Sequence, residues 1–422
     1  MALSSIWTKN IIKNIQQKGE EGKYQLRGFG ANMPYPSLDD LLIVPAQIHK
    51  TAYDKYRETI DTKVVIGEDL KRPLELEVPI FIAAMSFGAI SKHGKMAFAK
   101  GASQVGIATA TGEGGRLQEE TEICKKYGGK LIVQWSTGRF GVNMEYLKNA
   151  DAVELKLGQG AKPGMGGHLM AEKINEKIAE TRGIDEDTDA LSPCRHLDVE
   201  SAEDLAKHVN LLRELTNHEI PIIIKLGPGD IYEDTKLAIE AGPDAVAIDG
   251  GEGGTGCAPH IVAEHAGVPT LGVFEPAMKA FNETGAKERG IKFLIMGGIR
   301  NGADMYKALA LGADACGIGT AAMVAIGCIG CQQCHTGTCP YGIATQDEEK
   351  VAKLDPDEAG DKLGNYLKAT REELVTLTAL SGHNDTHEPS KNDLVALNIN
   401  ASAITGVKLM GYDKPVTSWF DK

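Results

Sequence analysis

The chain has 422 residues, 49 of them glycine, 5% aromatic residues and a formal net charge of −13. This charge argues against nucleic acid or an anionic membrane surface as a partner, and no basic run contradicts it. No window approaches the roughly 18 consecutive apolar residues that cross a bilayer, and the first residues lack a signal-peptide core, so we expect a cytoplasmic protein. The glycine content is typical of an α/β fold with many tight joints.

The first 77 residues carry Pro34, Pro36 and several polar turns. We predict that residues 1–77 form an extension that packs on one end of the following domain and does not fold independently.

Eight short β-type runs follow, most of them ending in Gly or Ser and followed by a helical stretch. Runs such as Ile222–Ile224 are continuously apolar, which is typical of parallel strands covered on both faces. Eight strand–helix repeats favour an α/β fold of the (β/α)8 TIM barrel type over 78–327, and a doubly wound open sheet is the competing prediction. Polar, Gly-rich motifs follow the strands, as in barrel active sites. The predicted strands are Val78–Met85, Ile107–Gly112, Leu131–Ser136, Ala152–Gly158, Pro221–Gly227, Ala245–Gly250, Lys292–Gly298 and Ala315–Ala321.

Two glycine-rich loops with polar side chains follow the second and fourth predicted strands. The first contains Glu113, and the second, at 158–168, contains Lys162 and His168. Arg182 lies on the next predicted helix. A lysine and an arginine at one cleft suit a dicarboxylate, because each cation can hold one carboxylate. Alternatively, Arg182 is a solvated surface charge and Glu113 only accepts hydrogen bonds within its own turn.

Lys225 ends the fifth predicted strand inside an apolar run. An ammonium group buried there costs free energy unless an anion meets it. The N1–O2 edge of a reduced flavin would be such an anion. Alternatively, Lys225 pairs inside the barrel with a carboxylate such as Asp249.

The segment Gly251–Gly256 matches the dinucleotide-binding pattern G-x-G-x-x-G and follows a predicted strand. Taken alone, this match is weak evidence. No ribose-binding acid or two-halved sheet supports a Rossmann unit, so we predict a barrel loop that lines the active site.

Glycines stand at the ends of the last two predicted strands. Gly297 and Gly298 end the seventh, and Gly319 and Thr320 lie at the end of the eighth. Flavin-binding barrels commonly hold the phosphate at these two loops, where backbone N–H groups converge on the anion. Alternatively, the glycines only permit tight turns.

Four cysteines, Cys328, Cys331, Cys334 and Cys339, stand in one short run that ends with Pro340. This spacing favours an iron–sulfur cluster at 328–340 over zinc, whose ligands usually come as two separated pairs. A zinc site and plain buried thiols remain alternatives.

Residues 341–422 form the last predicted region. Asp347–Leu380 is rich in Asp, Glu, Lys and Leu at helical spacing, which predicts a helical segment. The tail from Ser381 onward is polar, and we predict a loop-like structure for it.

In their order, these motifs resemble the FMN-binding synthase domain of glutamate synthase. The resemblance runs from about residue 75 to 350. It implies a TIM barrel that holds FMN beside an Fe–S cluster. It also implies that ammonia and 2-oxoglutarate give 2-iminoglutarate, which reduced flavin converts to L-glutamate. The matching segments are AAMSFGAIS at 83–91, GEGG at 112–115, STGRFGVNMEYL at 136–147, ELKLGQGAKPGMGG at 154–167, GGEGGTG at 250–256, GGIRNGAD at 297–304 and GIGTAAMVAIGC with CHTGTCPYGIATQD within 317–347.

The resemblance also assigns roles by position. Met85 and Ser86 would lie beside the isoalloxazine ring, Lys225 would face its N1 side, and the Gly297–Gly298 and Gly319–Thr320 loops would bind the phosphate.

The 2-oxoglutarate site would comprise Glu113, Lys162 and Arg182, with Glu113 assisting proton transfer. His168 stands where the family usually has Gln, so substrate hydrogen bonding there differs from the family pattern.

The family's cluster is a 3Fe-4S centre, and its cysteines correspond to Cys328, Cys334 and Cys339. Cys331 is additional. A fourth thiolate could retain a fourth iron, so we expect a 4Fe-4S cluster, with 3Fe-4S as the alternative.

Other parts of the family's enzymes have no counterpart in this sequence, including the amidotransferase half with its N-terminal catalytic cysteine and any NAD(P)H-binding domain. We therefore expect ammonia that is free or supplied by a separate glutaminase subunit. Electrons would come from ferredoxin or an NAD(P)H-dependent reductase subunit, in a homo- or hetero-oligomer. The alternatives are an N-methylglutamate synthase-like enzyme, whose relatives generally lack the cysteine run, and a non-catalytic flavin/Fe–S electron-relay subunit.

Overall fold

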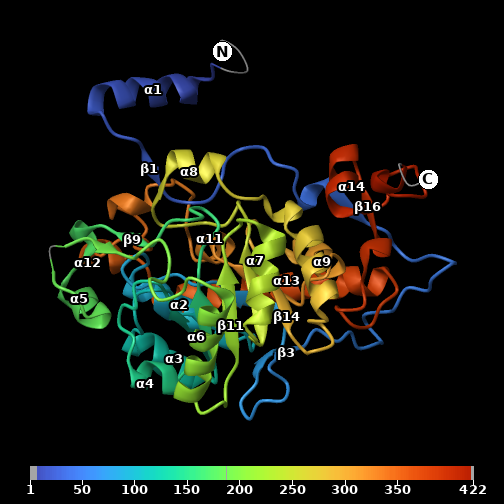
Figure 1. Cartoon of the computed structure of the whole chain (residues 1–422), viewed down its shortest axis with the longest axis horizontal. Helices are drawn as coiled ribbons and strands as arrows, with labels where there is room; N and C mark the ends of the chain where they lie inside the picture. Colours follow the sequence, from blue (N-terminus) through green and yellow to red (C-terminus); the bar gives the residue numbers. More distant parts are fainter. Residues whose placement is uncertain (1–6, 187, 420–422) are drawn as a thin grey trace.

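The computed structural model describes residues 7–186 and 188–419, and its centre is a parallel barrel (Figure 1). Eight strands pair in the order β5-β15-β14-β12-β11-β8-β7-β6, and the end strands β5 and β6 lie side by side. All eight predicted strands are present, so the TIM-barrel prediction is confirmed. The strands are β5 (Ile80–Ile82), β6 (Ala108–Ala110), β7 (Lys130–Trp135), β8 (Ala152–Lys156), β11 (Ile222–Leu226), β12 (Ala245–Asp249), β14 (Lys292–Met296) and β15 (Ala315–Ile318).

Helices surround the barrel, and short polar side chains begin most of them. Ser91, Ser201 and Asn301, for example, each accept a hydrogen bond from a backbone N–H of the first turn. Within the described ranges, no helix is long and apolar enough to cross a membrane. The helices are α2 (Lys92–Ser103), α3 (Gln118–Tyr127), α4 (Met144–Lys148), α5 (Glu176–Arg182), α6 (Ala202–Leu215), α7 (Ile231–Glu240), α8 (His260–His265), α9 (Phe274–Thr284), α10 (Gly302–Ala310) and α11 (Thr320–Ala325).

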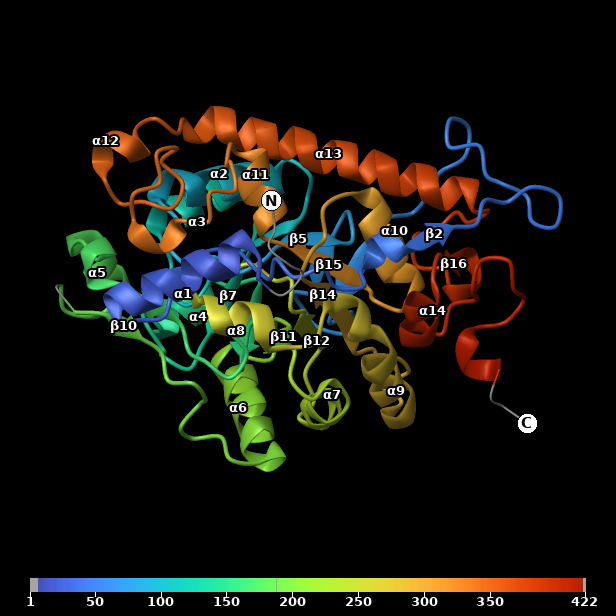
Figure 2. The same ribbon diagram turned by 90° about the horizontal axis from the view of Figure 1, so that it is seen from above.

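The longest helix, α13 (Pro356–Leu380), lies across α2 and α10 and closes the helical layer beside the β5–β6 joint (Figure 2). Glycines permit this close packing. A Cβ atom at Gly101 of α2 would stand 2.7 Å from Leu363 of α13, and one at Gly302 of α10 would stand 2.6 Å from the backbone nitrogen of Leu374.

The N-terminal extension reaches both ends of the barrel, whereas the sequence predicted contact with one. The hairpin of β3 (Val64–Ile66) and β4 (Leu74–Leu76) lies at the amino ends of the strands, where Glu77 N–H donates to Gly106. At the opposite end, β1 (Leu26–Arg27) pairs with β13 (Ala258–Pro259), and α1 (Lys9–Glu21) extends outward (Figure 1).

The C-terminal region is more ordered than its sequence predicted. The helical segment is present as α12 (Glu348–Val351) and α13. The tail, however, is not simply loop-like: β16 (Leu394–Ala396) pairs antiparallel with β2 (Leu41–Ile43), and α14 (Ile399–Thr405) follows. The prediction missed β16 because three residues carry no clear alternation and their pairing partner lies far away in the chain.

Candidate functional site

A cavity of about 560 Å³ opens at the carboxyl ends of the barrel strands. Its volume is in the range that encloses a cofactor-sized ligand. The structure brings together at this cavity every predicted cofactor and substrate residue, together with one of the four cysteines. These residues are Met85, Ser86, Glu113, Lys162, His168, Arg182, Lys225, Gly297, Gly298, Gly319, Thr320 and Cys334.

The glycines after β14 and the glycine after β15 are explained by different constraints. Gly297 and Gly298 have φ angles of 107° and 74°, so the turn itself explains both. Gly319 has φ of −120°, and a Cβ atom there would meet nothing within 4 Å. Neither the turn nor packing requires glycine at this position. Backbone is thus exposed to open cavity beside Thr320, as close approach of an anion would need.

Lys225 lies at the cavity floor, where its Nζ atom is 3.6 Å from Asp249 Oδ2. The predicted alternative of an internal ion pair is therefore present, and Lys225 also lines the cavity. Burial alone would lower the pKa of Lys225, but Asp249 and Glu154 outweigh burial and raise it. Lys225 is therefore charged at neutral pH, paired with Asp249 at the cavity lining.

A second buried lysine, Lys156, was not singled out from the sequence. It ends β8, beside Lys225 in the barrel register, and its Nζ atom lies 3.2 Å from Glu113 Oε2. Gln159 Oε1 also accepts a hydrogen bond from it at 2.6 Å. The signal that identified Lys225, a lysine at the end of an apolar strand, could have identified Lys156 as well.

Glu113 reaches across the cavity and makes contacts beyond its own turn. Ser192 Oγ donates to Glu113 Oε2 at 3.2 Å, and the carboxylate lies so close to Gly167 that no side chain fits there. Burial raises the pKa of Glu113, but Lys156, Lys162 and Arg182 outweigh burial and lower it. At neutral pH the group is therefore a carboxylate.

Arg182 is buried, with 3% of its surface exposed, so the alternative of a solvated surface charge is wrong. Its Nη2 atom donates to Phe87 O at 2.9 Å and to Ser86 Oγ at 3.2 Å. Its Nε atom has no hydrogen-bond partner in the described part of the chain. Burial lowers the pKa of Arg182 to about 10. A guanidinium with an unused buried donor fits an anionic ligand in the cavity.

Lys162 and His168 belong to the same loop, but their side chains are buried to different extents. Lys162 is buried, its Nζ atom donates to Cys257 O at 3.0 Å, and burial lowers its pKa to about 8. His168 is half-exposed in β9 (His168–Leu169), which pairs with β10 (Ala190–Leu191), and its Nε2 atom lies 2.9 Å from Asp189 Oδ2. Lys162 thus adds positive charge inside the cavity, while His168 is tied to its rim.

The four cysteines border a second, much smaller cavity, of about 10 Å³, next to the first. Within the described ranges, no three His, Cys, Asp or Glu side chains gather closely enough to hold one metal ion. An iron–sulfur cluster needs a wider arrangement of ligands than a single ion, because each thiolate binds its own iron and the sulfur atoms surround the cluster. The structure thus brings the four cysteines of the run to one small cavity, and in these ranges it assembles no ligand set for a single metal ion.

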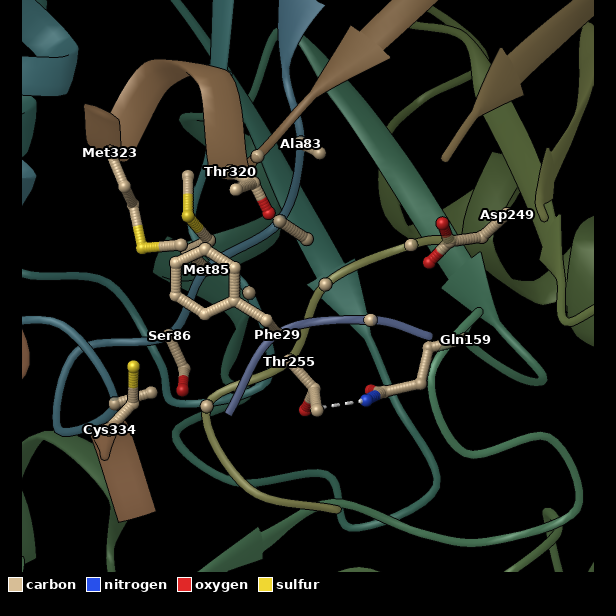
Figure 3. Close-up of a pocket in the computed structure, with 18 of the residues that line it drawn as sticks. Phe29, Ala83, Met85, Ser86, Gln159, Asp249, Thr255, Thr320, Met323 and Cys334 are labelled. Carbon is tan, nitrogen blue, oxygen red and sulfur yellow. Dashed lines mark hydrogen bonds between the residues drawn. The ribbon is translucent and has the colours of Figure 1, made fainter. Parts of the chain in front are cut away.

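Cys334 and Met323 line both cavities and so form the wall between them. Figure 3 shows their side chains at the larger cavity. Lys173, also missed from the sequence, is buried at this wall and donates to Cys334 O and to Ala89 O, each at 3.2 Å. The N-terminal extension adds Phe29, whose ring projects into the larger cavity (Figure 3).

Comparisons with known proteins agree with this geometry. Residues 32–384 match the family described as the conserved region in glutamate synthase. A glutamate synthase large subunit-like protein of Rhizobium meliloti is 40% identical, over 99% of this chain and 96% of that protein. The archaeal glutamate synthase (NADPH) of Methanocaldococcus jannaschii is 36% identical, over 96% of this chain and 85% of that protein. A flavocytochrome b2 variant with pyruvate bound shares the fold, with a TM-score of 0.57, 17% identity and coverage of 93% and 86%.

Proposed function

Because the chain belongs to the glutamate synthase family, we propose that it is an FMN-dependent synthase subunit. It combines 2-oxoglutarate with ammonia to give 2-iminoglutarate and reduces this imine to L-glutamate. The observation that carries the proposal is the set of buried cations, Lys156, Lys162 and Arg182, that surround the carboxylate of Glu113 at one cavity. Three cations around one carboxylate leave positive charge that an anionic ligand would balance.

Arg182 and Lys162 would each hold one carboxylate of 2-oxoglutarate. The unused Nε donor of Arg182 supports this role, since a carboxylate would satisfy it. Lys156 would complete the site, because it lies between Glu113 and Gln159 and can shift a donor to the substrate. Two anchored carboxylates leave the substrate little rotational freedom and fix its central carbon in the cavity.

The residues at the cavity fit FMN. Gly297, Gly298, Gly319 and Thr320 would hold its phosphate, Met85 and Ser86 would flank the ring, and Lys225 would face the N1–O2 edge. Bound FMN would supply the hydride that reduces the imine carbon. The positive charge of Lys225 would stabilise the anionic reduced ring.

Glu113 is placed to move protons at the reacting nitrogen. As a carboxylate among three cations, it can accept a proton from ammonium and return it to the amino group of the product. Ser192, which donates to its Oε2 atom, would hold it in position. His168, where the family usually has Gln, would contribute a hydrogen bond at the rim of the substrate site.

The cysteines would hold a 4Fe-4S cluster that delivers electrons to the flavin one at a time, with 3Fe-4S as the alternative. Cys334 supports this route, because it borders both cavities. The ultimate donor would be ferredoxin or a separate NAD(P)H-dependent reductase subunit. The NADPH named for the archaeal relative agrees with the second of these. A glutaminase subunit would supply ammonia where it is not taken up free.

Binding of 2-oxoglutarate to the FMN-loaded protein tests the substrate assignment directly. Calorimetry should detect binding of 2-oxoglutarate, whereas pyruvate, which lacks the second carboxylate, should bind far more weakly. Equal binding of the two acids would reject the paired-carboxylate site. Absence of any 2-oxoglutarate binding by flavin-replete protein would favour a non-catalytic relay subunit instead.

A further inference from the structure

A short N-terminal segment, residues 26–32, is here called the strap, and its residues 29–32 line the larger cavity. Its first two residues form β1, paired with β13. Gly28 N–H donates to Gln332 O at 2.8 Å, and Phe29 N–H donates to Thr255 O, also at 2.8 Å. The strap is therefore fixed between the cysteine loop and the loop that follows β12.

Contacts on both sides of the strap leave it little room to move. Arg27 is buried in an ion pair with Glu264, and its Nη2 atom also donates to Gly30 O at 2.7 Å. A Cβ atom at Gly28 would stand 2.9 Å from Cys334 Sγ, and one at Gly30 would overlap the backbone of Glu252. Glycine is therefore needed at both positions that flank Phe29.

Phe29 stands between these glycines in the left-handed region, with φ of 70°. A bulky residue rarely adopts this conformation, and the cost in free energy persists only where the surroundings impose it. Glycine would meet the backbone requirement more easily. The aromatic ring is therefore the feature that needs an explanation.

The ring lies in the cavity near the wall shared with the cysteines. Figure 3 shows it beside Met85 and Met323, below Thr320. Its edge also lies 3.9 Å from the position that a Cβ atom of Gly330, in the cysteine loop, would occupy. Phe29 thus lies where the strap and the cysteine loop meet at the edge of the cavity.

We propose that Phe29 is the closure residue of this cavity, and that its ring shields the reduced flavin from solvent and dioxygen on the side of the cysteine loop. The inference rests on FMN binding as given in the proposed function. An unshielded reduced flavin passes two electrons and two protons to dioxygen, which yields oxidised flavin and hydrogen peroxide. Closure by an apolar ring would keep those electrons for the imine.

The test compares Phe29→Ala, Phe29→Leu and Phe29→Gly with the wild type, each loaded with FMN. Tyr24→Ala is the matched control, because Tyr24 is an exposed aromatic residue just before the strap and does not line the cavity. After photoreduction, stopped-flow mixing with aerated buffer gives the rate of flavin reoxidation and the peroxide yield. Iodide quenching of flavin fluorescence independently reports how far solvent reaches the ring system.

Phe29→Ala should reoxidise severalfold faster than the wild type and show stronger iodide quenching, with FMN still bound. Phe29→Leu should fall between them, and Tyr24→Ala should match the wild type. Phe29→Gly removes the backbone strain at this position. Its flavin should nevertheless reoxidise as fast as that of Phe29→Ala, even if the variant folds more stably. Unchanged reoxidation and quenching in all three variants would overturn the proposal. Tighter FMN binding by Phe29→Ala would also overturn it, since the ring would then compete with the flavin.

Failure of this inference can be distinguished from failure of the proposed function. If the wild type binds FMN and forms glutamate, but the flavin of the Phe29 variants reoxidises no faster, only the closure role is rejected. If the wild type takes up no FMN, the proposed function fails first.

Discussion

At the scale of single residues, the main feature of this site is its set of buried charged side chains. Lys225 could be predicted from the sequence because a lysine that ends an apolar strand needs an anion, and the same argument applies to Lys156. The burial of Arg182 could not be predicted from its helix alone. It depends on contacts with Phe87 and Ser86, which lie almost a hundred residues earlier.

Arg182→Ala should raise the KM for 2-oxoglutarate strongly while leaving the FMN content unchanged. Loss of a charge-assisted hydrogen bond of about 1.5–3 kcal/mol corresponds to roughly a 10- to 100-fold change in KM. Steady-state kinetics and flavin absorbance measure the two quantities. Arg195→Ala is the control, because Arg195 is an exposed arginine outside the cavity. Loss of flavin from Arg182→Ala would reject the substrate-binding role.

The affinity for 2-oxoglutarate should fall as the pH rises through about 8. Burial lowers the pKa of Lys162 to about 8, so its charged form, which holds a carboxylate, is present below that pH and is lost above it. Arg182, with a pKa of about 10, stays charged throughout this range. The pH profile of the KM measures the effect.

Lys162→Met should have a high KM at every pH between 7 and 9 and should lack the rise near pH 8. Lys173 also has its pKa lowered to about 8, so the Lys162 variant identifies which of the two lysines is responsible. A rise near pH 8 that survives in Lys162→Met would contradict the assignment to Lys162.

At the scale of elements, the joint between β5 and β6 depends on one lysine. Lys95 of α2 is buried, its Nζ atom donates to Met85 O at 2.9 Å and to Ala110 O at 2.7 Å, and it lies 2.9 Å from Glu120. Met85 follows β5 and Ala110 ends β6, the two strands at the ends of the sheet order. Lys95 therefore joins these ends where no strand pairing is present between β5 and β6.

Lys95→Met should lower the free energy of unfolding by about 3–5 kcal/mol, because Glu120 would be left as an uncompensated buried charge. The double variant Lys95→Met with Glu120→Gln should recover part of this loss. Thermal unfolding followed by circular dichroism is the measurement. Equal losses in the single and double variants would show that the ion pair is not the cause.

The cysteine loop gives the second element-scale prediction. Cys331 is exposed. It is the cysteine that the resemblance to glutamate synthase marks as additional. If it retains a fourth iron, Cys331→Ser should convert a 4Fe-4S cluster into a 3Fe-4S one, visible by EPR in the oxidised, anaerobically prepared protein. Cys194→Ser, an exposed cysteine outside the run, should leave the spectrum unchanged. Three irons in the wild type would favour the alternative.

Strand and helix positions were largely predictable because most of the eight apolar runs end in glycine or serine, and each run carries its own signal. β2, β16 and the strap were not. Their conformation comes from partners far along the chain, such as Leu394 opposite Ile43 and Gly28 beside Gln332. Three-residue strands and a single aromatic residue between glycines have no periodicity from which their place can be inferred.

At the scale of the whole molecule, the barrel gathers on one rim groups that are distant in sequence. Glu113 follows β6, Lys156 ends β8, Lys225 is the penultimate residue of β11 and Thr320 follows β15. Because parallel strands end together, a cluster of polar residues at the carboxyl rim was predictable once the barrel was inferred. The N-terminal strap and the cysteine loop close that rim, so three regions of the chain build one site.

Turnover by anaerobically prepared protein tests the central claim most directly. With reduced methyl viologen or ferredoxin as the electron donor, the FMN-loaded protein should form L-glutamate only when both ammonium and 2-oxoglutarate are present, and methylamine should replace ammonium poorly. Protein that is replete in FMN and its Fe–S cluster but forms no glutamate under these conditions would contradict the account.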